Sequence, residues 1–129
     1  LATATLEELE PLRCGFRAKY LLDAARRVSS GQVQLDAIPQ MPLEQARAHL
    51  MQIVGVGPKV ADCALLYGFH RLECCPMDVW MKRVFAALYP NGLPDCAQDF
   101  IGIAQQYLFH YARCCPQILE APEKEAALV

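Results

Sequence analysis

The sequence has little of the alternation of apolar and polar residues that marks half-buried strands, which weighs against a β-sheet. It contains no apolar run long enough to cross a bilayer. Its first residues also lack the basic segment and apolar core of a signal peptide. We therefore expect no membrane association. The chain begins with Leu1 rather than Met, so we expect a processed product or a piece of a longer protein.

The seven cysteines include no C-x-x-C pair and no Cys/His array with zinc spacing. The number is odd, and two of the pairs, Cys74–Cys75 and Cys114–Cys115, are neighbours in sequence. Several of these thiols suit core positions. The pattern indicates reduced cysteines in a cytoplasmic protein and predicts no metal site.

The formal net charge is −2, which by itself weighs against a surface built wholly for phosphate contacts. However, six of the 14 acidic residues lie near the two ends of the chain. Between Pro11 and Leu119 the sequence has 11 Lys or Arg and eight Asp or Glu. The central part is therefore slightly basic, and a local basic face is compatible with the composition.

Helical periodicity runs through nearly the whole chain and predicts a single all-α helical bundle. Polar and glycine-containing breaks separate the predicted helices, which are Arg17–Val28, Pro42–Ile53, Lys59–Tyr67, Val79–Tyr89 and Cys96–Arg113. We expect residues 1–129 to form one domain in which residues 116–129 are a loosely held tail. The residues predicted to face the core of the first helix are Leu21, Ala24, Ala25 and Val28. Those of the last helix are Phe100, Ile103, Ala104, Tyr107 and Tyr111.

A tight turn, Gly55-Val56-Gly57-Pro58, joins two of these helices and predicts a helix-hairpin-helix motif. Two glycines in three residues permit a sharp turn with positive φ and leave the backbone uncovered. Pro58 suits the first position of the next helix, whose start offers N–H groups and the positive end of the dipole. Such a turn grips one DNA strand through its phosphates without reading sequence. An ordinary connection between helices without a ligand is the alternative.

Lys59 lies in the first turn of a helix that is apolar on most sides, so it either reaches water or is buried for a reason. Burial and the positive helix end would both favour a neutral, nucleophilic amine. Asp78 stands where the N-cap of the next helix belongs. If the two meet in one cleft, the amine can attack a sugar carbon while the carboxylate stabilises the cationic sugar. Taken singly, Asp78 fits a simple cap and Lys59 a solvated lysine.

Five sequence blocks resemble the 8-oxoguanine DNA glycosylases of the helix-hairpin-helix superfamily. They are Gly15-Phe16-Arg17-Ala18-Lys19-Tyr20, Ile53-Val54-Gly55-Val56-Gly57-Pro58-Lys59, Lys59-Val60-Ala61-Asp62-Cys63, Pro76-Met77-Asp78-Val79 and Ala104-Gln105-Gln106-Tyr107-Leu108-Phe109. Val54 departs from the family, which usually has Pro there. Trp80 stands where the eukaryotic proteins often have His, which is more typical of the bacterial branch.

The resemblance implies an enzyme, a bifunctional DNA glycosylase and AP lyase of base excision repair. Lys59 would be the Schiff-base nucleophile and Asp78 the catalytic carboxylate. Cys63 and Phe109 would pack on the two faces of the flipped 8-oxoguanine, and Gln105 would bond its Watson–Crick edge. Base flipping is needed because the anomeric carbon is shielded inside the stack.

The remaining implied roles concern DNA contacts. Gly55, Val56 and Gly57 would hold the strand, Phe16 would fill the gap left by the flipped nucleotide, and Arg17 would contact the orphaned cytosine. Lys82 and Arg83 lie off the apolar stripe of their helix and could reach phosphates. Each of these residues also fits a plain packing or surface role.

The expected partner is double-stranded DNA that contains oxidised guanine, bound by a monomer. The family's endonuclease III-like relatives hold an iron–sulfur cluster through four cysteines at fixed spacing, which Cys96, Cys114 and Cys115 do not supply. We expect no cofactor, and leave room for a monovalent or divalent cation at the hairpin when DNA is bound. Nothing in the sequence corresponds to the β-rich N-terminal domain that the family usually carries, so a truncated chain is expected.

Two other functions compete with the enzyme. A non-catalytic helix-hairpin-helix DNA-binding module, or an inactive glycosylase fragment, would keep Gly55 and Gly57 but would not need Lys59, Asp78 and Gln105 together. A structural helical domain for protein contacts would need neither the glycines nor the lysine.

Overall fold

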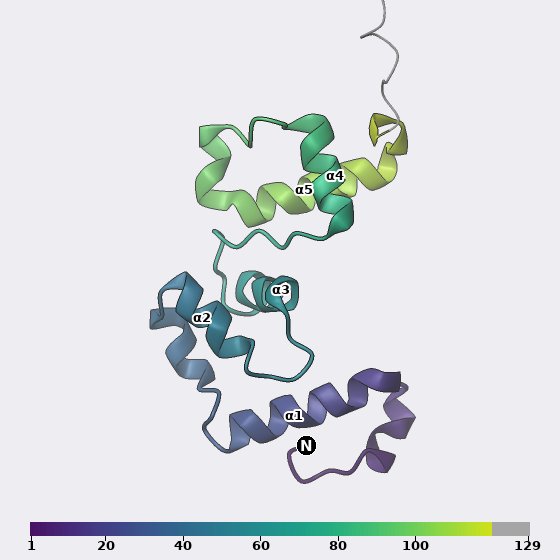
Figure 1. Ribbon diagram of the computed structural model, residues 1–129, viewed down its shortest axis with the longest axis vertical. Coiled ribbons are helices and arrows are strands. Elements are labelled where there is room, and N and C mark those ends of the chain that lie inside the picture. Colours follow the sequence, from purple (N-terminus) through teal and green to yellow (C-terminus); the bar gives the residue numbers. More distant parts are fainter. Residues whose placement is uncertain (120–129) are drawn as a thin grey trace, which may run out of the picture. The chain divides into compact units, whose positions relative to one another are not determined.

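The computed structural model describes residues 1–119, which form helices joined by short loops and contain no strand (Figure 1). The α-helices are α1 (Ala18–Ser29), α2 (Leu43–Leu50), α3 (Pro58–Gly68), α4 (Val79–Leu88) and α5 (Ile101–Cys114). The 3₁₀ helices are η1 (Glu7–Leu12), η2 (Gly15–Arg17), η3 (Leu35–Gln40), η4 (Asp95–Phe100) and η5 (Pro116–Leu119). The all-α prediction is confirmed. Of the predicted tail, residues 116–119 form η5 and residues 120–129 lie outside the described residues.

The chain divides into two compact units, Leu1–His70 and Arg71–Val129. The first contains α1, α2 and α3, and the second contains α4 and α5. That the whole chain forms one domain stays a prediction. Among the described residues, none of the helices has both the length and the apolar character needed to span a membrane.

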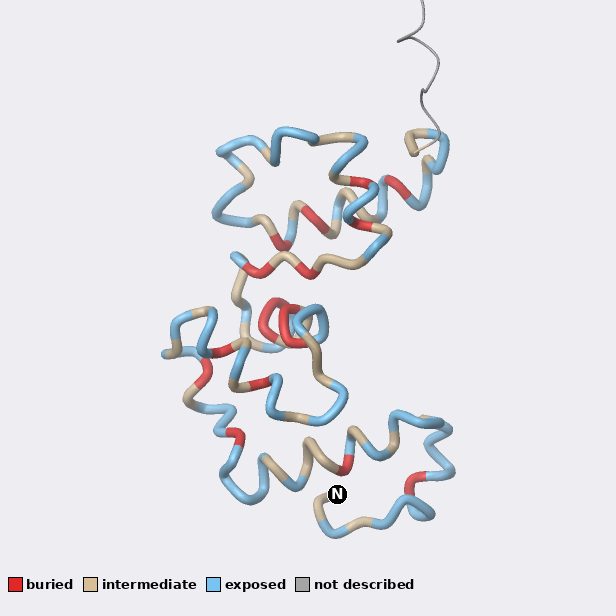
Figure 2. Tube along the Cα trace, viewed as in Figure 1, coloured by how far each residue is buried: buried red, intermediate tan, exposed pale blue. Residues whose placement is uncertain are grey.

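In the first unit, α2 and α3 pack against each other as the two arms of the predicted hairpin. Buried residues along α3 include Ala61, Leu65 and Leu66, and Figure 2 shows buried positions along this helix. Asp62 on α3 is also nearly buried, and its carboxylate accepts a 2.8 Å hydrogen bond from Nε of Arg47 on α2. This ion pair joins the two arms and fixes how they pack.

In the second unit, α4 and α5 pack around a core of Met81, Val84 and Ala112. Partly buried side chains surround this core; they are Met77, Trp80, Phe85, Leu88, Leu108, Phe109, Ile118 and Leu119. The start of α5 is tied to the loop before α4, because the Gly102 amide donates to the Leu72 carbonyl at 3.0 Å. The inner face of α4 consists of Met81, Val84, Phe85 and Leu88.

The predicted inner face of α1 is wrong. Leu21 and Val28 are exposed, whereas Leu22 is buried. The two adjacent leucines give the pattern two possible registers, and the periodicity alone does not say which one the neighbouring segments cover. The predicted residues instead line a shallow apolar depression of about 500 Å³ together with Leu1 and Ala2.

The last predicted helix differs in both its start and its inner face. Residues Asp95–Phe100 form the 3₁₀ helix η4, and the α-helix begins only at Ile101. The predicted core residues Phe100, Ile103, Tyr107 and Tyr111 are all exposed. The residues that α5 buries are Gly102, Gln105 and Ala112. A pattern of apolar residues missed this face because its central residue is polar.

Candidate functional site

The hairpin between α2 and α3 is a tight turn whose two glycines have different conformations. Gly55 has φ +85°, in the left-handed region, whereas Gly57 has φ −95° and ψ −177°, which is extended backbone. The expectation of positive φ therefore holds for Gly55 alone. The amide of Val56 donates to the Ile53 carbonyl at 3.0 Å and closes the turn.

Gly57 is the N-cap of α3, and Pro58 takes the first helical position as predicted. The first helical hydrogen bond runs from the Ala61 amide to the Gly57 carbonyl at 2.9 Å. A Cβ built on Gly57 would meet no atom within 4 Å, so this end of the helix opens onto free space. A helix start without a side chain over it suits the close approach of an anion.

Lys59 lies in the first turn of α3 and is exposed. Of the two possibilities that the sequence left open, the structure therefore shows the one in which Lys59 reaches water. Cys63, one turn further along, is half-buried. Tyr67 continues the same helix face at the same spacing. Burial raises the pKa of the Tyr67 phenol, with the Cys63 thiol adding to the rise and the Lys59 charge opposing it. Lys59, Cys63 and Tyr67 thus form one face of α3.

Asp78 is the N-cap of α4, as the sequence predicted. Its Oδ1 accepts a hydrogen bond from the Met81 amide at 2.8 Å. The side chain is half-buried and its backbone is extended, with φ −113° and ψ −178°. The cap holds the carboxylate in a fixed direction at the positive end of α4, where a negative charge is favoured.

Gln105 and Phe109 lie one turn apart on the inner face of α5. Gln105 is 3% exposed, and its Nε2 donates to the Pro76 carbonyl at 3.1 Å. Its Oε1 accepts from Nε2 of Gln106. Phe109 packs against the Met81–Val84–Ala112 core, and the Arg113 guanidinium lies 5.7 Å from its ring centroid. Gln105 can be buried because both its amide nitrogen and its amide oxygen form hydrogen bonds.

Phe16 and Arg17 precede α1 and are both exposed. The Arg17 guanidinium carbon lies 4.9 Å from the Phe16 ring centroid. Phe16 is 66% exposed, so its ring is accessible from solvent. Lys82 and Arg83 on α4 are exposed, as predicted.

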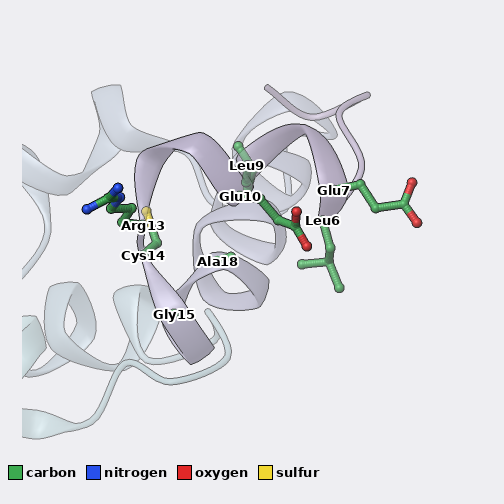
Figure 3. A pocket seen from close by; sticks show the side chains of 8 residues that line it. All are labelled: Leu6, Glu7, Leu9, Glu10, Arg13, Cys14, Gly15 and Ala18. Atoms are coloured by element: carbon green, nitrogen blue, oxygen red, sulfur yellow. The ribbon is translucent and has the colours of Figure 1, made fainter.

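A depression of about 620 Å³ lies at the start of the chain, and Gly15, the sequence neighbour of Phe16, is one of its lining residues. Its lining residues come from η1 through the first turn of α1 and are Leu6, Glu7, Leu9, Glu10, Arg13, Cys14, Gly15 and Ala18. Figure 3 shows Arg13 and Glu7 at opposite ends of it. Its charged lining residues are both acidic and basic, and none of the predicted site residues lines it.

No protein-family model matches the chain. Curated proteins do match. The probable N-glycosylase/DNA lyase of Methanothermobacter thermautotrophicus is 34% identical over 119 residues, covering 84% of this chain and 38% of that protein. The N-glycosylase/DNA lyase of Saccharomyces cerevisiae is 38% identical over 91 residues, covering 63% of this chain and 24% of that protein.

Two solved structures match most of the described helices. The structure of MBOgg1 in complex with a low-affinity DNA ligand is 43% identical, with a TM-score of 0.78, and covers 90% of this chain. The 8-oxoguanine glycosylase/lyase of Clostridium acetobutylicum, in complex with double-stranded DNA containing cytosine opposite 8-oxoguanine, is 33% identical, with a TM-score of 0.75. The chain is a homologue of the 8-oxoguanine DNA glycosylases. It spans 44% and 43% of these two structures, so it matches less than half of each glycosylase.

Homology to the 8-oxoguanine DNA glycosylases confirms the resemblance that the sequence blocks indicated. The match to the first of these structures covers 90% of this chain. The roles of the candidate site residues stay predictions.

The sequence predicted no role for three residues that contact or flank the hairpin. Asp23 and Tyr20 on α1 contact the turn, and Tyr67 extends the face that carries Lys59. Spacing could have found Tyr67, which lies four residues after Cys63. No signal in the sequence points to Asp23, because its partner Val54 lies 31 residues away.

Proposed function

We propose that this chain carries the catalytic helices of a bifunctional DNA glycosylase/AP lyase that removes 8-oxoguanine from double-stranded DNA through a Schiff base at Lys59. One observation carries the proposal. Lys59 follows an open hairpin directly, on the helix whose N-terminus that hairpin leaves uncovered, in a chain homologous to the 8-oxoguanine DNA glycosylases. A binding module would need the hairpin but not this lysine.

The hairpin supports binding of one DNA strand. Gly57 places no side chain over the start of α3, so a phosphate can reach the backbone there. The helix dipole favours that negative charge. This grip depends on backbone groups rather than on many basic side chains, which accords with a net charge of −2. A cation at the hairpin in the DNA-bound state belongs to the same proposal, and the reaction itself needs no resident cofactor.

The chemistry follows from an amine and a carboxylate. The neutral Lys59 amine attacks the anomeric carbon, and the bond to the base breaks with its electron pair leaving on the base, which takes up a proton. The Asp78 carboxylate stabilises the positive charge that develops on the sugar. The nitrogen loses a proton and the sugar ring opens to give the Schiff base. Loss of a proton from the adjacent carbon then expels the 3′ phosphate by β-elimination.

In this proposal Cys63, Gln105 and Phe109 contact the damaged base. Phe16 fills the gap that the flipped nucleotide leaves in the duplex, and Arg17 contacts the orphaned cytosine. The exposure of Phe16 and the guanidinium over its ring support a wedge that is held in place before DNA arrives. Gln105 has its amide engaged by Pro76 and Gln106. To bind a base edge, the Gln105 amide would have to exchange its hydrogen bond to the Pro76 carbonyl for one to the base. It would therefore favour a base that offers an equivalent hydrogen bond.

A strand-nicking assay tests the proposal. The chain is incubated with a labelled duplex containing 8-oxoguanine opposite cytosine, beside a duplex with a preformed abasic site. We expect cleavage of both, lost in Lys59→Gln and retained in the matched control Arg13→Gln, which removes a positive charge from an exposed position outside the proposed site. Binding of both duplexes without cleavage would favour the non-catalytic module. Cleavage of the abasic duplex alone would limit this chain to the lyase step.

A further inference from the structure

We propose that Asp23 and Tyr20 on α1 are positioning residues for the DNA-binding hairpin, which they hold from outside the two helices that the hairpin connects. The inference rests on the proposed function, because it assigns these residues a part in DNA binding. It goes beyond that function by adding a third helix to the motif.

Asp23 reaches the hairpin through its carboxylate. Oδ2 accepts a 2.7 Å hydrogen bond from the Val54 amide and a second 2.7 Å bond from Nε of Arg27. Val54 is the residue directly before Gly55, where the turn begins. A hydrogen bond to a charged acceptor is stronger than a neutral one. Arg27 fixes the carboxylate from its own helix, so Asp23 holds the entrance of the turn in one place.

Tyr20 supports the next residue of the turn. A Cβ built on Gly55 would lie 2.6 Å from the Tyr20 ring, so the ring packs directly against the backbone at this glycine. Gly55 also has φ +85°, a conformation that other residues rarely adopt. Two successive backbone positions, Val54 and Gly55, are thus set by α1.

The proposed wedge, Phe16, lies in η2, directly before the same helix. The Phe16 and Tyr20 rings meet edge to face, with centroids 6.1 Å apart and planes at 81°. A continuous set of contacts therefore runs from Arg17 over Phe16 to Tyr20 and on to Gly55. The wedge and the strand grip share one support, and α1 fixes the spacing between these two DNA contacts.

The Asp23 carboxylate cannot assist DNA binding by electrostatic attraction, because it is negatively charged. A negative charge beside a turn that meets a phosphate would weaken binding, even though Asp23 is paired with Arg27 at 2.7 Å. A role through charge predicts tighter binding when the charge is removed. A role through position predicts weaker binding when the acceptor is removed, and partial recovery when a neutral acceptor is retained. These opposite signs make the inference testable.

The test measures DNA affinity and turnover separately in Asp23→Ala and Asp23→Asn. Asp36→Ala is the matched control, because it removes an exposed carboxylate of the same unit away from the hairpin. Affinity is measured by fluorescence anisotropy with a duplex holding a tetrahydrofuran abasic analogue. The single-turnover lyase rate is measured at saturating protein on an abasic duplex. All measurements are made at a temperature where circular dichroism shows each variant folded.

We expect Asp23→Ala to raise Kd about tenfold or more, as loss of a hydrogen bond to a charged group does. The saturated lyase rate should stay within about twofold of the parent. Asp23→Asn should recover part of the affinity, and Asp36→Ala should not change it.

If Asp23→Ala does not fold, a comparison of Tyr20→Ala with Tyr20→Phe makes the same test, since only the ring contacts Gly55. Unchanged or tighter binding by Asp23→Ala, or by Tyr20→Ala where it is needed, would overturn the inference. Failure of the parent protein to bind either duplex would overturn the proposed function and this inference with it, and that outcome is seen in the parent alone.

Discussion

Gly55 and Gly57 occupy the same turn but are required for different physical reasons. Gly55 needs the absence of a Cβ for its left-handed backbone and for the Tyr20 ring beneath it. Gly57 has an ordinary extended backbone and free space around it. Gly55 is therefore needed for the hairpin to fold, whereas we propose that Gly57 is needed for a phosphate to approach the start of α3.

This difference predicts opposite outcomes for two alanine variants. Gly55→Ala should lower Tm, because positive φ costs a non-glycine residue roughly 1–2 kcal/mol and its Cβ would clash with Tyr20. Gly57→Ala should leave Tm unchanged but weaken binding of the abasic-analogue duplex, because its methyl group would stand where the phosphate approaches. Thermal unfolding and anisotropy measure the two effects. Equal Tm values for both variants would contradict this assignment.

Asp78 has a structural role that is visible in the fold and a proposed catalytic role. Its Oδ1 caps α4 through the Met81 amide. Asp78→Ala should therefore lose about 1 kcal/mol of stability, the usual contribution of such a cap. Asp78→Asn keeps a capping oxygen and should retain most of that stability while losing nicking of the 8-oxoguanine duplex, because an amide does not stabilise a cationic sugar. An Asp78→Asn variant with unchanged nicking would show that Asp78 is only a cap.

At the scale of the elements, the sequence predicted which segments are helical better than it predicted which way they face. The turn at Gly55–Gly57 and the cap at Asp78 were predictable because local chemistry determines them. The inner face of α5 was not, because Gln105 is buried through bonds to Pro76 and to its neighbour Gln106. Apolar periodicity cannot represent a buried polar residue whose partner lies 29 positions away.

The contact between the Asp23 carboxylate and the hairpin predicts how stability depends on pH. The Val54 amide first, and then Arg27, hold the pKa of Asp23 below its ordinary value of 3.8. Its stabilising contribution is therefore fully present above that ordinary value and is lost as pH falls through the lower, folded pKa. The stability difference between the parent and Asp23→Asn should be constant from pH 7 to pH 5 and shrink below about pH 4. Urea unfolding at each pH measures it, and a difference that grows towards low pH would contradict the account.

At the scale of the whole molecule, the family was recognisable from sequence because its motifs are short and local. What sequence could not predict is how α1 supports the hairpin, since that contact joins residues far apart in the chain. The sequence also could not decide whether Lys59 reaches water or is buried, because helix periodicity does not say whether a helix end is covered.

The small number of basic residues proposed to contact phosphates predicts a modest salt dependence of DNA binding. These residues are Lys82 and Arg83, and each phosphate neutralised contributes about 0.9 to the slope of log K against log salt concentration. The slope should therefore be about −2. Lys82→Ala should reduce its magnitude by about one. Binding whose slope is near zero, or does not change in Lys82→Ala, would show that these side chains do not reach phosphates.

The central claim is a covalent intermediate at Lys59, and borohydride trapping tests it most directly. The chain is mixed with a duplex containing 8-oxoguanine opposite cytosine, sodium borohydride is added, and the cross-linked peptide is identified by mass spectrometry. The account predicts a covalent protein–DNA species whose DNA is attached at Lys59 and which is absent in Lys59→Gln. Attachment at another residue, or no covalent species with either this duplex or an abasic one, would contradict it.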